Sequence, residues 1–581
     1  MGIDIFVTDR LRPAGLTQGP DEIEMMRIWL ADCVENHRQC KARWQLGPAR
    51  VLDLCAFADS DDLRLVDCPS DPSAPHAPFF CLSHCWGEQN AAPLRTTKGT
   101  LSRHKQVIHL ESLSNTFRDA VKITRQLEQR YLWIDSLCII QDDPADWEAQ
   151  ASRMPSVYGA SILTLSALSA KDGDGGCRTL GLTSASNTGV KYVDVDVGGQ
   201  RIRFFDKPPE FWFSEYGDDP YKHDGFGPNP LRQRAWTLQE RELPVRSVHF
   251  SKNMLLWQCQ TLKASSQLPC GTFARPDDIE PSLILACEDL GAAVDAWKLR
   301  ARWFDIVEDY TSRLLTREED KLPALAGLAA SYAPQEIINR YLAGLWETQL
   351  PSALLWRVLS PYNDADRVLG DRRRAFFPRR PTRYRAPSWS WASIDGAVSY
   401  DSQRRSSSCS PQYGRRDDFA QIASLRIRAV HTSLAGSSAH GKVSEGRLHV
   451  EGRVAVLTCE DSRLAPKKES IDGHVYWSLK TADESPVGVI YPDVPLELSF
   501  RQVVHCLQIH DEPAIPELDR ISHSECYGYK NLDVDWRLAS CMGIALTPLR
   551  ERENMFRRIG LCRWVKKEVF DAVVAGHLTI V

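Results

Sequence analysis

The sequence predicts an α/β protein, in which a parallel β-sheet domain is followed by a helical segment and a C-terminal antiparallel β-rich domain. Short apolar runs alternate with helical patterns between residues 79 and 168. This alternation is typical of a parallel sheet covered by helices on both faces. After residue 420, short runs of alternating polar and apolar residues dominate, which indicates antiparallel strands.

Three apolar runs are the predicted parallel strands. The first is "FFCLSHCWG", which begins at residue 79 and ends in a turn at Gly87. The second is "RYLWIDSLCII" (130–140), stopped by the acidic turn "QDDPAD", and the third is "SILTLSAL" (161–168). Ligands of such a sheet bind beyond the carboxyl ends of its strands, so the residues after each run are candidate site residues.

Helical patterns separate these runs. In "LSNTFRDAVKITRQL", apolar residues recur on one face, and Ser114 is the predicted N-cap. Trp147, Ala151, Met154 and Tyr158 mark a second helix. A loop-rich insertion covers 169–230, after which we expect a helix at about 235–243 and a fourth strand, "RSVHFSKNMLLWQC".

The remainder of the chain divides by composition. The stretches "ILACEDLGAAVDAWKLRARWFDIVEDY", "DKLPALAGLAASYA" and "LPSALLWRVLS" are predicted helices, and "RAPSWSWASIDG" supplies the apolar anchors Trp389, Trp391 and Ile394. A Ser- and Arg-rich stretch indicates a linker, and the alternating runs beyond it predict a closing sandwich. The predicted divisions are an N-terminal helical region (1–78), the α/β domain (79–265), a helical region (266–400), the linker (401–420) and the β-rich domain (421–581).

Composition limits the classes of partner. The 71 basic and 76 acidic side chains leave a formal net charge of −5, so nucleic acid and an anionic membrane are not expected as main partners. No apolar run has the length of a bilayer-spanning helix, and the N-terminal stretch has neither a secretory signal nor a myristoylation motif. The 17 cysteines are scattered along the chain, as expected of small core residues in a protein of a reducing compartment. A cytoplasmic location is therefore expected.

Met26, Trp29, Cys33, His37 and Cys40 fall on one face of a predicted helix at 21–42. The favoured interpretation is a packed core stripe. Cys33, His37 and Cys40 also offer three metal ligands, but a zinc site requires a fourth ligand and usually has paired loop spacings. No metal is predicted, and whether this face binds one stays open.

Two further cysteine groups are ambiguous. In "CLSHCWG", Cys81, His84 and Cys85 are potential zinc ligands, but they point to opposite faces of a strand and lack a second cluster. Cys138 lies within the second apolar run, and a catalytic role there would require a base such as His84 from the adjacent strand. A core cysteine is the favoured interpretation.

The arginine run "DRRRAFFPRRPTRYR" (371–385) has two interpretations. Its basic and aromatic residues could bind nucleic acid, but a solvated loop is favoured because the chain is acidic overall. The sequence has neither a Walker loop nor a GxGxxG fingerprint, so a phosphate cradle of that kind is not expected.

Four stretches converge at the ends of the predicted strands: Ser83–Gly87, Asp135–Gln141, Asp142–Asp146 and Trp236–Glu240. Asp135 follows a buried strand, where a carboxylate needs a hydrogen-bond partner or a ligand, and both roles stay open. Glu240 follows Trp236 by four residues at a helix start. A carboxylate in a partly desolvated aromatic pocket is suited to stabilising an oxocarbenium ion as a glycosidic bond breaks. Its alternative role is that of an ordinary helix acid.

The stretches "LSHCWG", "LSNTFRDAVKITRQLEQRYLWIDSLCIIQDDPADWEAQASRMPSVYGAS" and "RAWTLQERELPVRSVHF" closely resemble the fungal heterokaryon-incompatibility (HET) domain over about residues 79–260. The flanking "WLADCVENHRQC", "DKLPALAGLA" and "RAPSWSWASIDG" resemble full-length HET proteins. The resemblance implies an intracellular fungal protein, many of whose relatives trigger cell death on recognising non-self.

HET domains in turn look distantly like Toll/interleukin-receptor (TIR) domains, which have a flavodoxin-like parallel sheet. Several TIR domains cleave NAD at the nicotinamide–ribose bond with a glutamate that follows a tryptophan by four residues. This resemblance implies that Glu240 is the catalytic carboxylate, although Arg241 replaces the usual apolar residue and the 169–230 insertion is long. The residues implied to border the nucleotide are Ser83, Trp86, Gly87, Asp135, Gln141, Asp142, Trp236 and Gln239.

The leading hypothesis is an incompatibility or immune effector that hydrolyses NAD or a related nucleotide. NAD is then a substrate, and neither a cofactor nor a metal is expected. The expected partners are the nucleotide, an activating incompatibility protein and further copies of the chain. Two alternatives stay open: a non-enzymatic signalling module that acts by oligomerising, and a biosynthetic enzyme that reuses the same cleft.

Overall fold

The computed structural model divides the chain into two compact units, Met1–Gly291 and Ala292–Val581. Each unit is described by itself. The predicted linker 401–420 lies outside the described residues. The structure describes residues 5–7, 22–41, 47–69, 77–87, 93–177, 192–197, 200–205, 229–252, 254–266, 272–273, 296–332, 340–359, 378–400, 423–436, 438–461, 476–499, 501–512, 540–550 and 552–581.

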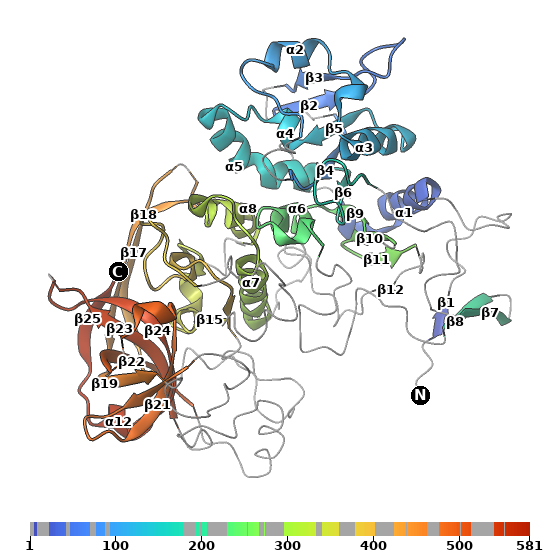
Figure 1. Ribbon diagram of the computed structural model, residues 1–581. Helices are drawn as coiled ribbons and strands as arrows, with labels where there is room; N and C mark the ends of the chain where they lie inside the picture. Colours follow the sequence, from blue (N-terminus) through green and yellow to red (C-terminus); the bar gives the residue numbers. More distant parts are fainter. Residues whose placement is uncertain are drawn as a thin grey trace. The chain divides into compact units, whose positions relative to one another are not determined.

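The first unit is built around a mixed sheet (Figure 1). Within the described residues its strand order is β12-β11-β10-β9-β6-β4-β5-β2-β3. The strands are β2 (Arg50–Asp53), β3 (Arg64–Asp67), β4 (Phe79–Ser83), β5 (Tyr131–Ile134), β6 (Leu163–Ser166), β9 (Arg246–Phe250), β10 (Leu255–Cys259), β11 (Leu262–Ser265) and β12 (Thr272–Phe273).

The central strands β5, β4, β6 and β9 are parallel, which confirms the parallel sheet predicted from the three apolar runs. Phe80 of β4 pairs with Leu132 on one side and Leu163 on the other, and all three are fully buried. Numbered along the chain, these strands lie in the order 2-1-3-4, which doubly wound folds share. The carboxyl ends of β4 and β5 therefore meet at one edge.

Antiparallel strands extend this sheet on both sides, which the sequence did not predict. The stretch expected to be one strand, 246–259, is a hairpin of β9 and β10, with Phe250 paired with Leu255. On the other side, β2 pairs with β5 and β3 with β2, within the region expected to be helical (1–78). The N-terminal unit is a mixed sheet rather than a purely parallel one.

Helices cover the sheet between its strands. They are α1 (Glu22–Asn36), η2 (Arg38–Cys40), α2 (Leu101–Gln106), η4 (Leu110–Ser112), α3 (Asn115–Gln126), α4 (Asp135–Cys138), α5 (Pro144–Ala160), η5 (Leu231–Gln233) and α6 (Thr237–Glu242). The predicted N-cap is confirmed, because the Ser114 side chain accepts from the Phe117 amide at 3.4 Å. The chain passes through α3 from β4 to β5 and then returns through α5 in the opposite direction across the sheet to β6, so right-handed crossovers place the two helices on opposite faces.

A hairpin lies within the described residues of the loop-rich insertion. Its strands β7 (Tyr192–Val197) and β8 (Gln200–Phe205) form a small sheet with β1 (Ile5–Val7). The rest of the insertion at 178–191 and 206–228 lies outside the described residues.

The second unit begins with helices and short hairpins. Its first elements are α7 (Ala296–Thr311), η7 (Glu318–Asp320), α8 (Pro323–Tyr332), β13 (Tyr341–Leu342), β14 (Leu345–Trp346), η8 (Glu347–Gln349), η9 (Ser352–Leu354), β15 (Arg357–Val358), η11 (Trp391–Ser393) and β16 (Val398–Ser399). The predicted helix "LPSALLWRVLS" is wrong, since this stretch is the single turn η9 followed by β15, which pairs with β16. Trp389, Trp391 and Ile394 are fully buried, as expected of core anchors.

The C-terminal strands form one mainly antiparallel sheet, part of which closes on itself, rather than the predicted sandwich. The sheet order is β17-β18-β25-β24-β21-β20-β19-β22-β23, and an additional pairing of β23 with β24 closes the barrel-like part. One neighbouring pair, β24 and β25, is parallel. The elements are β17 (Arg426–Leu434), β18 (Val443–Gly452), β19 (Val454–Asp461), β20 (Trp477–Lys480), β21 (Pro486–Pro492), η16 (Pro495–Glu497), β22 (Gln502–Glu512), β23 (Ser540–Pro548), β24 (Met555–Lys566), α12 (Lys567–Asp571) and β25 (Gly576–Ile580).

Candidate active site at the ends of the parallel strands

The structure brings two of the predicted site residues into direct contact. Ser83 is the last residue of β4, and its hydroxyl donates a hydrogen bond to Oε2 of Glu240 in α6. Both side chains are buried, with exposed fractions of 3% for Ser83 and 7% for Glu240. Glu240 is therefore at the carboxyl end of the parallel strands but enclosed, whereas the sequence predicted a partly desolvated pocket for it.

Asp135, a second carboxylate, follows β5 directly and begins α4. Its Oδ1 lies 3.0 Å from Nε2 of His84 and accepts the Ser136 amide at 2.7 Å, while Oδ2 accepts the indole N–H of Trp86 at 2.8 Å. Its side chain is 19% exposed. Asp135 thus has the hydrogen bonds that a buried carboxylate needs, and it orients two side chains from the end of β4.

The two carboxyl groups have oppositely shifted pKa values. Burial, together with the negative charge of Asp135, raises the pKa of Glu240 to about 7. For Asp135, burial opposes ionisation, but the charge and hydrogen bond of His84 outweigh it and lower the pKa. A carboxylate that stays ionised beside a carboxyl that titrates near neutrality is a recurrent arrangement of acid–base catalysts.

Two neighbours of this pair were absent from the predicted set. Arg234 donates to the carbonyl oxygen of His84 at 2.8 Å, and its charge favours the ionised forms of Glu240 and Asp135. Tyr158 of α5 donates to the Leu82 carbonyl at 3.5 Å and interacts with Glu240. Arg234 lies two residues before Trp236 in the same motif, and this position could have marked it as a site residue. Tyr158 was predicted only as part of a helix face.

Aromatic rings flank the carboxyl groups. Trp236 precedes α6 and packs edge-on against Trp147 of α5, with ring centroids 5.9 Å apart. Trp86 is half-buried and held by Asp135.

The other predicted binding residues lie in the surrounding loops and in α6. Gly87 is exposed and has a φ of +79°, which glycine adopts without strain. Gln141 donates to the Asp135 carbonyl at 3.0 Å, Asp142 accepts the Lys98 amide at 2.7 Å, and Gln239 is buried in α6. Through these bonds, Gln141 and Asp142 hold backbone groups near α4 in place.

The cysteines near this site have the character of core residues. Cys81, Cys85 and Cys138 are all buried. Burial raises the pKa of Cys85 to about 11 and that of Cys138 to about 12, so neither thiol ionises at neutral pH. His84 is bonded to Asp135 rather than to a thiol. Cys81, His84 and Cys85 do not form a potential metal site among the described residues.

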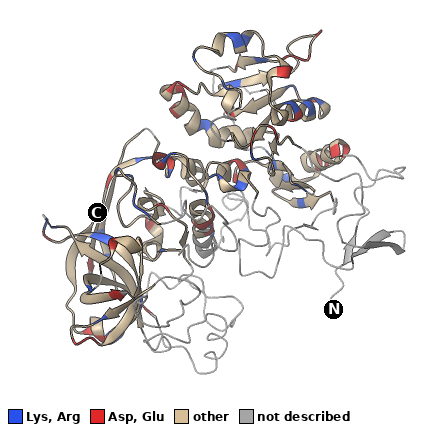
Figure 2. Ribbon diagram, in the orientation of Figure 1, with Lys and Arg blue, Asp and Glu red and all other residues tan. Residues whose placement is uncertain are grey.

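Charged residues are interspersed over the described ribbon (Figure 2). From the arginine run, Arg379 and Arg385 pair with Asp395 at 3.3 and 2.8 Å, and Arg380 pairs with Glu497 at 2.9 Å. Residues 371–377 of this run lie outside the described residues. Within the described residues, no helix has the length and apolar character needed to cross a membrane.

Comparison with known families identifies this region. Residues 79–240 match the family model for heterokaryon incompatibility protein (HET). The match begins at Phe79, the first residue of β4, and ends at Glu240, so it contains both carboxyl groups. Comparisons with curated proteins and with solved structures gave no match. Residues 79–240 of this chain are therefore a HET domain.

Proposed function

We propose that this chain is an effector of fungal heterokaryon incompatibility whose HET domain hydrolyses NAD or a related nucleotide at the N-glycosidic bond. The family match supports the role in incompatibility. The observation that carries the enzymatic part is the position of Glu240, a carboxyl group with a pKa of about 7 at the carboxyl ends of the parallel strands. In doubly wound folds this edge is where ligands bind.

In this mechanism, ionised Glu240 stabilises the ribosyl cation that forms as the bond to the leaving base breaks. Water or a substrate hydroxyl then captures the cation at the anomeric carbon and releases its proton. Asp135 holds His84 and Trp86 at the same edge. Trp86 and Trp236 supply aromatic surfaces for the base. The chemistry resembles that of glycosidases, where carboxylates stabilise an oxocarbenium-like transition state.

The burial of Glu240 adds a condition to the proposal. With 7% of the residue exposed, its carboxyl group cannot contact a sugar until the surrounding residues move. Binding of an activating partner, or self-association of the chain, would supply the energy for that opening. The isolated chain at low concentration is then expected to turn over little nucleotide.

Two further features support a TIR-like mechanism. The central parallel strands have the 2-1-3-4 order of flavodoxin-like sheets. Glu240 follows Trp236 by four residues, and β9 begins shortly afterwards at Arg246. These similarities support the proposed cleavage of NAD, whereas the family match alone supports only the role in incompatibility.

The proposal is tested by incubating the full chain with NAD, at low and high protein concentration and with a crowding agent, and by measuring nicotinamide and ADP-ribose. We expect release that grows more than linearly with protein concentration in the wild type and falls to background in Glu240→Gln. Glu242→Gln is the matched control, because Glu242 lies in the same helix with the same 7% exposed fraction. Equal release from the wild type and Glu240→Gln would overturn the proposal.

The enclosure of Glu240 also favours a second candidate, a non-enzymatic module that signals by assembling. Ser83 already satisfies the Glu240 carboxyl, so this acid could serve only to hold α6 against the end of β4. Sedimentation or light scattering that shows concentration-dependent assembly, with no nucleotide turnover in the assembled fraction, would favour this candidate over the enzyme.

A further inference from the structure

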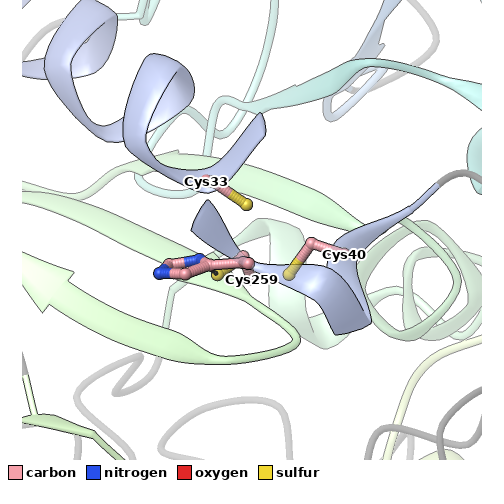
Figure 3. A group of neighbouring side chains, drawn as sticks. Cys33, Cys40 and Cys259 are labelled. Carbon is pink, nitrogen blue, oxygen red and sulfur yellow. Dashed lines mark hydrogen bonds between the residues drawn. The ribbon is translucent and has the colours of Figure 1, made fainter. Parts of the chain in front are cut away.

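We propose that Cys33, His37, Cys40 and Cys259 form a structural zinc site. Their potential ligand atoms all lie within 4.8 Å of one another. Figure 3 shows the sulfur atoms of Cys33, Cys40 and Cys259 gathered between the end of α1, the following turn and the strand of the β10–β11 hairpin. This inference is independent of the proposed enzymatic activity.

The missing fourth ligand comes from a distant part of the sequence. Cys33 is in α1, His37 follows this helix, Cys40 ends η2, and Cys259 is the last residue of β10. Met26, Trp29, Cys33 and Cys40 are almost fully buried, as expected of a core stripe, but the helix ends at Asn36 rather than near residue 42, and Cys40 lies in η2. Three cysteines and one histidine are a common ligand set of closed, four-coordinate zinc sites.

The spacing of the ligand atoms suits such a site. Metal–ligand bonds of about 2.0–2.3 Å place the ligand atoms of a tetrahedron about 3.5–3.8 Å apart. Sγ of Cys259 lies 3.4 Å from Nδ1 of His37, close to this range. The three cysteines are free thiols rather than disulfides. An ion could therefore be accommodated with small adjustments of the side chains.

The groups around the four ligands match those that support zinc in proteins. Nε2 of His37 lies 3.5 Å from Oδ2 of Asp32, so this carboxylate can hold the Nε2 proton and leave Nδ1 free to bind metal. The backbone amide of Leu262 donates to Sγ of Cys259 at 3.2 Å. Hydrogen bonds of this kind stabilise a thiolate.

Charge balance adds an independent argument. Zn²⁺ with three thiolates and a neutral histidine carries a net negative charge, which would be costly in a buried position without a counter-charge. Arg246 of β9 is only 7% exposed, and its Nε donates to Sγ of Cys33 at 3.1 Å. A second donor of the same guanidinium bonds to the Cys40 carbonyl at 2.5 Å. A buried guanidinium at this distance from the Cys33 sulfur would offset the negative charge of a zinc-bound thiolate.

The site would fasten segments that lie on either side of the family match in the sequence. Three ligands precede residue 79 and the fourth follows residue 240, whereas the match covers 79–240. Trp29 of α1 and Trp257 of β10 pack beside this site, with ring centroids 5.9 Å apart. The ion would thus fix α1 and η2 on the antiparallel strands next to the parallel core.

The test uses the full chain expressed in zinc-supplemented medium, purified under reducing conditions without a metal-affinity tag, and analysed for metal by mass spectrometry. We expect one zinc ion per chain that survives dialysis. Cys259→Ser and Cys33→Ser should lower the content at least tenfold. Cys177→Ser is the matched control, because Cys177 is a buried thiol of the same unit outside this cluster, and it should keep its zinc.

A second measurement keeps the proposal testable if the variants fail to fold. Wild-type protein in which Co²⁺ replaces zinc should show thiolate-to-cobalt charge transfer and the intense visible bands of tetrahedral cobalt. Wild type that lacks bound metal, an octahedral cobalt spectrum, or equal zinc content in Cys259→Ser and the wild type would each overturn the proposal. A disulfide between two of these cysteines in the reduced, purified protein would do the same.

Discussion

The hydroxyl of Ser83 donates a hydrogen bond to the carboxyl group of Glu240, which lies 157 residues later in the sequence. This bond joins the end of the central strand β4 to the short helix α6. It favours the ionised form of Glu240, whereas burial and the nearby charge of Asp135 favour the protonated form. The balance of these effects determines both the stability of this edge and its proposed chemistry.

Replacing Ser83 by alanine is expected to destabilise the N-terminal unit by about 1–3 kcal/mol, because a buried carboxylate loses its donor. The loss should be greater at pH 8 than at pH 5, where Glu240 is mostly protonated. Hydrogen exchange of the β4 and α6 amides measures this loss of stability at each pH. The exposed Ser152, which donates only to a carbonyl of its own helix, provides the control Ser152→Ala. A loss of the same size at both pH values would contradict this role of Ser83.

Glu240→Gln should reduce the pH dependence of stability. The pKa of Glu240 is raised from 4.5 to about 7 in the folded protein. Its stabilising contribution is therefore complete below pH 4.5 and is lost as the pH rises through 7, by about 3 kcal/mol in total. In the wild type, amide exchange near α6 should accelerate between pH 5 and 8 beyond the intrinsic effect of pH, and in the variant this excess should disappear. An unchanged excess would show that another group titrates.

Asp493→Asn should destabilise the C-terminal unit by about 3–5 kcal/mol, because it leaves a buried guanidinium without its counter-ion. Asp493 and Arg558 are both 0% exposed, and Arg558 also donates to the carbonyls of Leu354 and Trp356. Asp571→Asn removes an exposed partner of Arg453 and should cost less than about 1 kcal/mol. Denaturant unfolding of the two variants compares these costs, and similar values would refute the structural role assigned to Asp493.

If zinc binds as proposed, Asp32→Asn should weaken zinc binding by about 10–100-fold, because this carboxylate orients His37. Competition with a chromophoric chelator gives the affinity. Glu35→Gln alters an exposed acid of the same helix and should leave the affinity unchanged. Equal affinities in Asp32→Asn and the wild type would exclude the orienting role but not the site itself.

The sequence predicted the parts of the fold that depend on local pattern. The runs at 79, 131 and 163 form buried parallel strands, because continuous apolar segments are stable only where both faces of a sheet are covered. The hairpin of β9 and β10 was missed because the short polar segment between its two apolar runs contains neither glycine nor proline to mark a turn. The pairing of β23 with β24, which closes the barrel-like sheet, is a choice of partner that strand periodicity does not encode.

In the candidate sites, too, the sequence predicted individual residues that a local motif marks, but not the long-range contacts between them. The motif around Trp236 pointed to Glu240, and the place of Ser83 at the end of a predicted strand pointed to Ser83, but the contact between them is a long-range one. The burial of Glu240 depends on how its neighbours pack in three dimensions, and the spacing of residues in the sequence does not predict that packing. Cys259 escaped notice because 222 residues separate it from His37, so no local spacing relates them.

The most direct test of the central claim is the pH dependence of nicotinamide release from NAD by the assembled protein. The account predicts that release by the wild type and Glu242→Gln rises with pH as Glu240 ionises, with an apparent pKa no higher than about 7, because opening of the site relieves the burial that raises this pKa, whereas Glu240→Gln stays at background at every pH. A Glu240→Gln protein that keeps both the rate and the pH profile of the wild type would contradict it.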